Sequence, residues 1–120
     1  MSQVILVGKD WTFRALIRAQ LLEEGLDVEA YETAGDAAKA IVGRYRLPKL
    51  MVADLTSSDD PGTELSQLAR WAERFPVWII AGREIASDAE AHDPRFQRIL
   101  FRPVDVGQLV KEIKSAVHGR

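Results

Sequence analysis

Residues 50–54 read Leu50-Met51-Val52-Ala53-Asp54, an apolar run that ends on a carboxylate. Apolar side chains on successive residues are typical of a strand that is buried on both faces in a parallel sheet. Two runs of the same kind lie on either side of it along the chain, at Val4–Val7 and Val77–Ala81. Amphipathic stretches separate the three runs, and this alternation predicts right-handed βαβ units.

Two weaker segments complete the predicted sheet. Asp27–Glu32 alternates small apolar residues with charged ones, which is typical of an edge strand. Ile99–Phe101 is a short apolar run that stops at Arg102-Pro103. With these segments, the sequence predicts an α/β fold with a five-stranded parallel sheet.

The first predicted helix spans Trp11–Glu24. Phe13, Ile17 and Leu21 follow the i, i+4, i+8 spacing of a single buried stripe. Gly25 provides a natural stop at the C-terminal end of this helix.

The other helices are predicted mainly from residues that cap their ends. Thr33 caps a second helix that runs to about Tyr45, and a third helix follows the polar loop Leu55–Gly62. Asp105 caps the last helix, with a glutamine three residues later as in a capping box. Arg83–His92 has few apolar residues, so any helix there is expected to be weakly anchored.

The residues that follow the predicted strands are expected to converge. In a parallel sheet, ligands bind at the carboxyl ends of the strands, beside the point where the strand order reverses. Gly8-Lys9-Asp10, Asp54, Ala81-Gly82 and Arg102 all stand at such ends. A buried strand has little structural need to end on a carboxylate, so Asp54 is the first candidate functional residue, with a cap or ion-pair role as the alternative.

The composition bounds the classes of function. The chain has 120 residues, 16 Lys+Arg, 18 Asp+Glu, two His and no Cys, with a net charge of −2. This balance excludes the basic body of a nucleic-acid-binding protein, and the lack of Cys excludes disulfides and thiolate sites. The chain starts without a secretory signal and has no apolar segment of membrane-spanning length. We expect one cytoplasmic domain over residues 1–120, with no output domain and no nucleic-acid or membrane partner.

The order and spacing of these features resemble the receiver domain of bacterial two-component response regulators, over essentially the whole chain. Asp54 stands where this family has its phosphoacceptor, and Gly62-Thr63-Glu64-Leu65 is similar to the start of the family's third helix. Phe101-Arg102-Pro103 stands where the family has a lysine followed by a cis proline, and Asp105 matches the next cap. The resemblance implies a flavodoxin-like, CheY-like sheet of order 2-1-3-4-5 with helices on both faces.

The resemblance also implies phosphoryl transfer, which this sequence supports only in part. The family holds Mg²⁺ with an acidic pair just after the first strand, where this chain has Gly8-Lys9. At about 4 Å and an effective dielectric near 20, one unit charge acts on another with roughly 4 kcal/mol. Lys9 should therefore repel the metal, and we expect no metal site. Asp10 is expected to cap the first helix, and Asp10 and Asp54 are the only candidate ligands if a site does form.

Further positions depart from the family pattern. Ala81 replaces a hydroxyl residue at the end of the fourth strand, and Ile99 replaces the aromatic switch residue of the fifth. Both switch positions are therefore degenerate. Arg102 replaces the family's lysine and keeps its charge, and Ser58 replaces the proline of the acceptor loop.

Several side chains have two interpretations. Lys9 is expected to pair with Asp54, since a desolvated carboxylate needs a partner, and the alternative is that Lys9 reaches solvent. Arg102 is expected to point into the cleft, where its fork could bind both oxygens of Asp54. Trp11 either covers the pocket or packs on the first helix.

A basic strip on the first helix is a candidate docking surface. Arg14 and Arg18 lie off the buried stripe of that helix. The strip is either a solvated face or a surface that docks an acidic partner, because family receivers meet their histidine-bearing partners near this helix.

Two hypotheses of function follow. The favoured one is a pseudo-receiver, a signalling module without enzymatic activity or cofactor that binds a histidine kinase, another signalling protein or a second copy of the chain. The alternative is an atypical phosphoacceptor, phosphorylated at Asp54 by a histidine kinase or phosphotransfer protein with Mg²⁺. A nucleotide-binding enzyme is disfavoured, because Gly8-Lys9-Asp10 lacks the spacing of a P-loop.

Overall fold

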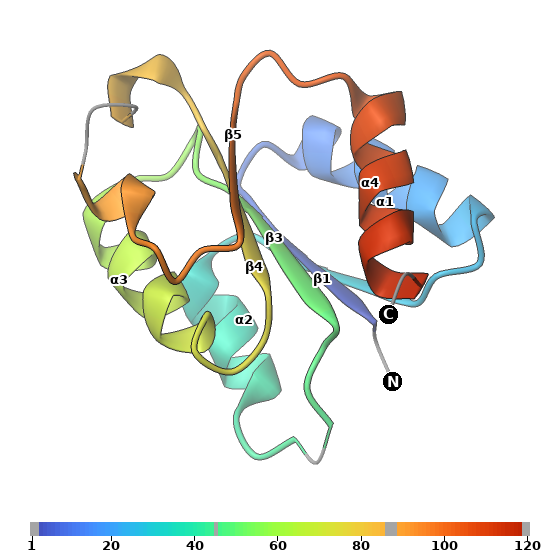
Figure 1. Cartoon of the computed structure of the whole chain (residues 1–120), viewed down its shortest axis with the longest axis horizontal. Helices are drawn as coiled ribbons and strands as arrows, with labels where there is room; N and C mark the ends of the chain where they lie inside the picture. The colour runs from blue at the N-terminus through green and yellow to red at the C-terminus, as the bar shows by residue number, and fades with distance from the viewer. Residues whose placement is uncertain (1–2, 45, 86–88, 119–120) are drawn as a thin grey trace.

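The computed structural model describes residues 3–44, 46–85 and 89–118, which form a sheet with helices on both faces (Figure 1). The strands are β1 (Val4–Val7), β2 (Val28–Tyr31), β3 (Leu50–Asp54), β4 (Val77–Ala81) and β5 (Arg98–Phe101). The α-helices are α1 (Trp11–Glu23), α2 (Ala34–Ile41), α3 (Pro61–Trp71) and α4 (Val106–His118). None of these helices combines the length and apolar character needed to cross a bilayer.

The five strands are all parallel and lie in the order β2-β1-β3-β4-β5. This confirms the predicted strand order and the predicted edge position of β2. Helices α1 and α4 cover one face of the sheet, and α2 and α3 cover the other (Figure 1). The carboxyl ends of β1 and β3 lie side by side at the point where the strand order reverses, which is where this kind of sheet binds ligands.

Alternate residues of the strands supply two apolar cores. On β1, Ile5 and Val7 pack with α2 and α3, whereas Val4 and Leu6 pack with α1 and α4. The strands β1, β3 and β4 are buried along their whole length. Because both faces are covered, these strands need apolar residues at every position, which explains their continuous runs.

The segment between β4 and β5 has no α-helix in its described residues. It forms two short 3-10 helices, η1 (Arg83–Ile85) and η2 (Ala89–His92), in agreement with the weak helical pattern of this stretch. Residues 86–88 lie outside the described part of the chain. The edge strand β5 is only partly covered, and Phe101 at its end is 38% exposed.

Helix α3 begins earlier than predicted, inside the supposed loop Leu55–Gly62. Asp60 caps it by accepting a hydrogen bond from the N–H of Thr63 at 3.2 Å. Pro61 occupies the first helical position, where its missing N–H leaves no bond unmade. The aspartate and proline of the polar stretch are therefore a helix start.

Helix α2 ends earlier than predicted. Thr33 caps its start as expected, but the helix stops at Ile41 rather than near Tyr45, which lies outside the described residues. Gly43 adopts a φ of 81° just beyond this end, a conformation that glycine adopts without strain. Asp105 caps α4 as predicted, by accepting from the backbone N–H three residues later at 2.9 Å.

Candidate functional site

Three charged residues meet at the carboxyl ends of β1, β3 and β5. Asp54 is the last residue of β3, Asp10 lies in the loop after β1, and Arg102 directly follows β5. One guanidinium nitrogen of Arg102, Nη2, donates to Oδ2 of Asp54 at 2.6 Å and to Oδ2 of Asp10 at 3.1 Å. The fold thus brings together three of the residues expected at the strand ends, Asp10, Asp54 and Arg102, and the cation between the two carboxylates belongs to the chain itself.

Both carboxylate oxygens of Asp54 are engaged. Oδ1 accepts hydrogen bonds from the backbone N–H of Thr56 at 3.1 Å and from its hydroxyl at 2.5 Å. Oδ2 accepts from Arg102. Only 7% of Asp54 is exposed, so these donors replace the water that the carboxylate loses on burial.

Asp10 has a structural role as well as a place in the charge cluster. Its Oδ1 accepts from the N–H of Phe13 at 3.1 Å, which makes Asp10 the N-cap of α1, as predicted. The hydrogen bond from Phe13 lowers the pKa of Asp10, and Arg102 lowers it further, against the opposing effect of partial burial. The carboxylate of Asp10 is therefore more stable in the folded chain than in the unfolded one.

Arg102 is held from several sides. Its backbone N–H donates to the carbonyl of Ala81 at 3.0 Å, and the Arg102-Pro103 peptide bond is cis, as the resemblance implies. The guanidinium lies 3.9 Å from the centroid of the Phe13 ring. Burial lowers the pKa of Arg102, but the bonds to Asp54 and Asp10 outweigh this effect and leave the pKa raised.

The expected two-pronged bond between Arg102 and Asp54 is not formed. Only Nη2 of Arg102 bonds to the carboxylates, and it is shared between Asp54 and Asp10. Nε of Arg102 is buried without a hydrogen-bond partner in the described part of the chain. The guanidinium therefore bridges two carboxylates rather than clamping one.

The predicted pairing of Lys9 with Asp54 is wrong. Nζ of Lys9 bonds to Asp59 at 2.5 Å in an exposed ion pair, which raises the pKa of Lys9. The residue of this loop that contacts Asp54 is Gly8, where an added Cβ would lie 3.2 Å from the Cβ of Asp54. Because Arg102 already neutralises Asp54, the flexible side chain of Lys9 extends to the loop after β3 instead.

The two positions compared with the family's switch residues offer no polar group to the cleft. Ala81 is fully buried at the end of β4, and its carbonyl accepts from the N–H of Arg102. Ile99 is half-buried and packs against the core shared with α2 and α3. Their side chains are apolar, so neither can form a hydrogen bond that changes between two states.

The predicted basic strip on α1 is divided between two roles. Nη1 of Arg14 donates to the carbonyl of Gly8 at 2.5 Å, so Arg14 helps to fix the loop after β1. Arg18 is exposed. Trp11, which was predicted either to cover the pocket or to pack on α1, is 67% exposed.

A buried glutamate anchors the loop that follows Asp54. Glu64 of α3 is 9% exposed, and its two oxygens accept from the N–H of Ala34 at 2.7 Å and from the hydroxyl of Ser58 at 2.5 Å. These bonds tie the loop after β3 to the start of α2. The loop is therefore held at one end by the bonds between Thr56 and Asp54 and at the other by the bond between Ser58 and Glu64. These bonds fix the position of Thr56 beside Asp54.

Sequence reasoning missed two residues of the site. Thr56 stands two residues after Asp54, and an aspartate often accepts a hydrogen bond from the backbone N–H two residues ahead of it. This spacing could have indicated the contact from the sequence. Phe13 was assigned to the apolar stripe of α1, and nothing in the sequence indicates that its ring covers Arg102.

The acidic residues at this site do not fit Mg²⁺. The ion requires near-octahedral oxygen coordination, with carboxylates free to bind it. Asp10 and Asp54 are both bonded to Arg102, and the described residues contain no group of three or more His, Cys, Asp or Glu that could hold a metal. The guanidinium supplies the positive charge that these carboxylates need.

Comparison of the sequence with models of known protein families and with curated proteins finds no match. The structure is similar to the response regulator receiver domain protein of Clostridium thermocellum, with a TM-score of 0.78 and 15% identity over 99% of this chain and 96% of that one. It is also similar to the receiver domain of NtrX from Brucella abortus, with a TM-score of 0.77 and 21% identity over 98% and 99% of the two chains. A CheY-like receiver domain protein of Methanospirillum hungatei gives 0.78 and 17%, over 99% and 95%. These similarities establish the CheY-like fold.

Replacement of Arg102 by Met should leave Asp10 and Asp54 facing each other without a cation. We expect the free energy of unfolding at neutral pH to fall by about 1–3 kcal/mol, the usual cost of an unsatisfied buried polar group. Urea unfolding followed by circular dichroism measures this change. Adding Asp54→Asn should restore part of the loss, because it removes one of the two negative charges.

The control for that experiment is Lys9→Met. It breaks only an exposed ion pair, so the unfolding midpoint should not change. If the Arg102→Met loss were as large with Asp54→Asn as without it, Arg102 would stabilise the fold through packing and not through charge.

The lowered pKa of Asp10 predicts a pH-dependent contribution to stability. A carboxyl with a lower pKa in the folded state contributes stability above its ordinary pKa of about 4, and this is lost as the pH falls through the folded value. Asp10→Asn keeps a capping side chain without the charge. The difference in unfolding free energy between wild type and variant should have its full value at about pH 6, above the ordinary pKa of the carboxyl, and should decrease as the pH falls below about 4. A difference that does not change with pH would contradict the charged role of Asp10.

Proposed function

We propose that this chain is a receiver-like signalling module that acts by binding another protein, with Arg102 holding its acidic cleft in place of a metal ion. One observation carries the proposal: Nη2 of Arg102 bridges the carboxylates of Asp54 and Asp10. The CheY-like fold supports the signalling role. In this proposal the module is cytoplasmic, has no enzymatic activity and needs no cofactor.

The state of Asp54 argues against ready phosphorylation. A carboxylate attacks phosphorus through a lone pair on a free oxygen, yet Asp54 accepts three hydrogen bonds from Thr56 and Arg102. Hydrogen bonds of this kind stabilise the charged carboxylate and lower its nucleophilic reactivity. An attack would require at least one of these bonds to break inside a site that is nearly buried.

The surroundings of Asp54 also disfavour the metal that phosphoryl transfer uses. Mg²⁺ normally offsets charge on the phosphoryl oxygens. Here Gly8 has no side chain to contribute a ligand, and Lys9, where the family has an acid, is bonded to Asp59. An added metal would have to displace the guanidinium of Arg102 from both carboxylates.

The outer face of α1 is the surface that we assign to partner binding. Trp11, Ala15, Arg18 and Leu22 recur at helical spacing on this face, and Trp11 and Leu22 are 67% and 43% exposed. A groove of about 580 Å³ runs beside them, between α1 and the edge strand β2. No acidic residue lies on the helix before Glu23. Such a surface fits an amphipathic helix with acidic residues along its margin, of the kind that a histidine kinase or another signalling protein could present.

Asp54 as a phosphoacceptor is the second candidate function. Its position at the end of a buried central strand, with the Asp10 carboxylate close by, favours this alternative. It requires the Arg102 bridge to open when a phosphodonor binds.

Titration of the ¹⁵N-labelled protein with Mg²⁺ and then beryllium fluoride separates the two candidates. We expect no saturable amide shifts at Asp10, Asp54 or Gly82 in the wild type. The variant Lys9→Asp with Arg102→Lys should gain Mg²⁺-dependent shifts there. It replaces the positive charge of Lys9 by a carboxylate and removes the guanidinium that bridges Asp10 and Asp54. Saturable shifts in the wild type that disappear in Asp54→Asn would establish the phosphoacceptor instead.

The docking face can be tested through the fluorescence of Trp11, the most exposed tryptophan among the described residues. The probes are purified helical dimerisation domains of histidine kinases from the same organism. We expect one of them to change the fluorescence saturably, and Arg18→Glu to weaken that binding about tenfold, equivalent to roughly 1.4 kcal/mol. Lys111→Glu on α4 makes the same charge change elsewhere and should leave the affinity unchanged. Equal effects of the two variants, or no binding by any domain, would contradict the assignment.

A further inference from the structure

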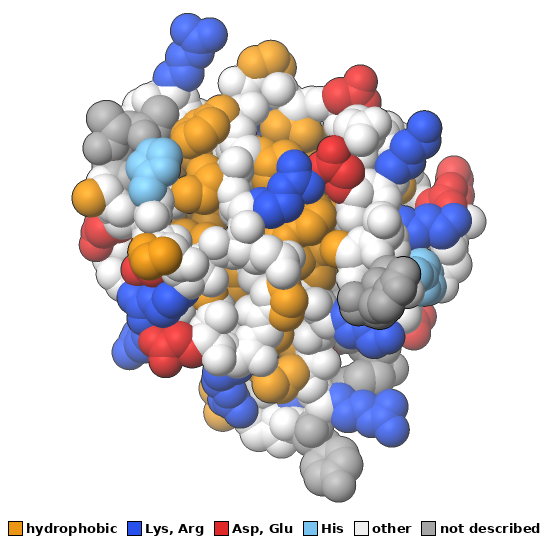
Figure 2. Space-filling model, in the orientation of Figure 1, with side chains coloured by type: hydrophobic (Ala, Val, Ile, Leu, Met, Phe, Trp, Pro, Cys, Tyr) orange, Lys and Arg blue, Asp and Glu red, His pale blue; other side chains and the backbone are white. Residues whose placement is uncertain are grey.

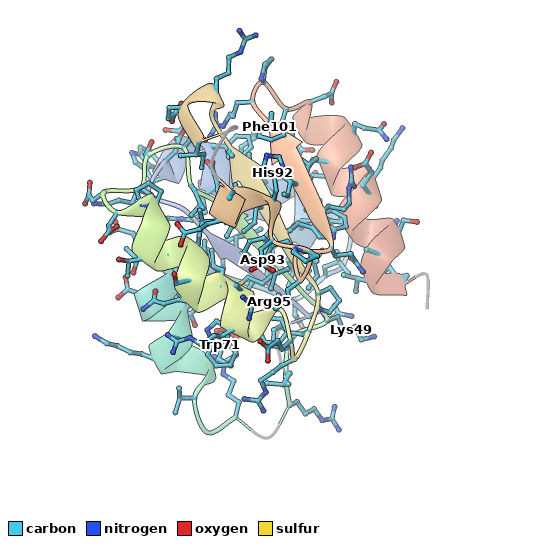
Figure 3. All side chains as sticks on the ribbon, turned by 60° about the vertical axis from the view of Figure 1, so that its left-hand side comes forward. Lys49, Trp71, His92, Asp93, Arg95 and Phe101 are labelled. Atoms are coloured by element: carbon cyan, nitrogen blue, oxygen red, sulfur yellow. The ribbon has the colours of Figure 1, made fainter. Side chains whose placement is uncertain are left out.

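A second groove lies between α2 and α3, on the face of the sheet opposite α1. It has a volume of about 280 Å³. It is lined by Ala38 of α2 and by Gln67, Arg70, Trp71 and Arg74 at the end of α3. Figure 3 shows Trp71 at the lower end of this helix. We call this surface the basic groove. Its lining residues belong neither to the cluster of Asp10, Asp54 and Arg102 nor to the outer face of α1.

The two arginines of the basic groove have no acidic partner among the residues that the structure describes. Arg70 and Arg74 are both exposed, and neither forms an ion pair with the described residues. Glu73 lies next to Arg74 in the sequence, but its carboxylate is bonded to Arg95 at 2.6 Å. Arg95 also binds Asp93, at 2.8 Å. Two guanidinium groups therefore line one groove without a counter-charge from the described part of the chain.

Trp71 gives the basic groove a fixed aromatic wall. Its ring stacks on Phe75, with centroids 5.7 Å apart and an interplanar angle of 26°. Phe75 is only 6% exposed, so it holds the tryptophan against the core. The guanidinium of Arg74 lies 5.9 Å from the Trp71 centroid. This arrangement limits the positions that Arg74 adopts and reduces the entropy that it loses on binding.

The charge pattern of the sequence extends beyond the groove. Residues 38–49 and 67–76 together contain six Lys or Arg and one Glu, a net charge of +5. The rest of the chain contains ten Lys or Arg and seventeen Asp or Glu, a net charge of −7. Figure 2 shows Lys and Arg side chains gathered at the lower end of the molecule, where α2 and α3 end.

Helix dipoles account for only part of this charge. Lys39 and Arg70 lie in the last turns of α2 and α3, where a cation offsets the negative end of the dipole. Arg74 and Arg46 lie beyond the helix ends and are exposed. Within residues 3–44, 46–85 and 89–118, their positive charge is used neither by an ion pair nor by a helix end.

We propose that the basic groove binds an acidic segment of a partner protein. The arginine fork pairs with carboxylates through two parallel bonds, and the Trp71 face offers an apolar surface for the side-chain stems between them. The groove is small, which suits a few side chains of a peptide. The net charge of −7 on the rest of the chain opposes a long polyanion such as a nucleic acid. This inference does not depend on the function proposed for Asp54 and Arg102.

The probe for the experiment is a fluorescein-labelled peptide, Glu-Glu-Leu-Glu-Glu with blocked ends, followed by fluorescence anisotropy at low salt. Arg70→Glu with Arg74→Glu should weaken its binding at least tenfold. The matched control, Arg83→Glu with Lys111→Glu, makes the same change in net charge away from the groove and should keep the wild-type affinity. Circular dichroism of each variant verifies that it is folded. Amide shifts on peptide addition should centre on Ala38, Gln67 and Trp71.

Each alternative occupant has its own result. Equal losses in the two double variants would overturn the proposal, because they would reflect net charge alone. Stronger binding of an oligothymidine of equal charge, or of phosphatidylserine vesicles, lost in Arg70→Glu with Arg74→Glu, would assign the groove to nucleic acid or membrane instead. Self-association in sedimentation equilibrium that the same variant abolishes would assign it to a second copy of the chain.

Discussion

The bridge from Arg102 to Asp10 and Asp54 is the interaction on which the site depends. It joins residues at the carboxyl ends of three strands of one sheet, so a single guanidinium links β1, β3 and β5. Without Arg102 the two carboxylates that share its Nη2 would repel each other, and the bridge replaces that repulsion with attraction to the guanidinium. The cap on α1 and the turn at Thr56 hold the two acids in place for it.

The fold was predictable because its strongest patterns come from burial on both faces. Val4–Val7 and Val77–Ala81 match β1 and β4 at both ends, since a central strand must be apolar throughout and stops where polar residues begin. Helix ends were less certain. The ends of the helices depend on local hydrogen bonds, such as that of Asp60, and on the left-handed backbone of Gly43. The periodicity of apolar residues does not indicate these features.

The position of the candidate site could be predicted from the sequence, but only some of its ion pairs and hydrogen bonds could. Strand topology alone places Asp10, Asp54 and Arg102 at one edge of the sheet. It does not decide which cation neutralises Asp54, because both Lys9 and Arg102 have side chains long enough to reach a neighbouring loop. The outcome depends on competing contacts, namely the ring of Phe13 beneath the guanidinium and the exposed Asp59 beside Lys9. These contacts depend on how side chains from distant parts of the chain are arranged in space, and residue spacing in the sequence does not indicate them.

The uneven charge of the chain has a consequence for how it approaches other molecules. The basic segments precede β3 and β4, at the amino ends of the strands, whereas residues 54–60, at the carboxyl end of β3, contain three Asp and no Lys or Arg. Opposite charge at opposite ends gives the molecule a dipole moment along the strand direction, although its net charge is only −2. In the field of a charged surface such a molecule experiences a torque and turns before contact. The encounter orientation is thereby set over a distance of about one Debye length, roughly 8 Å at physiological ionic strength.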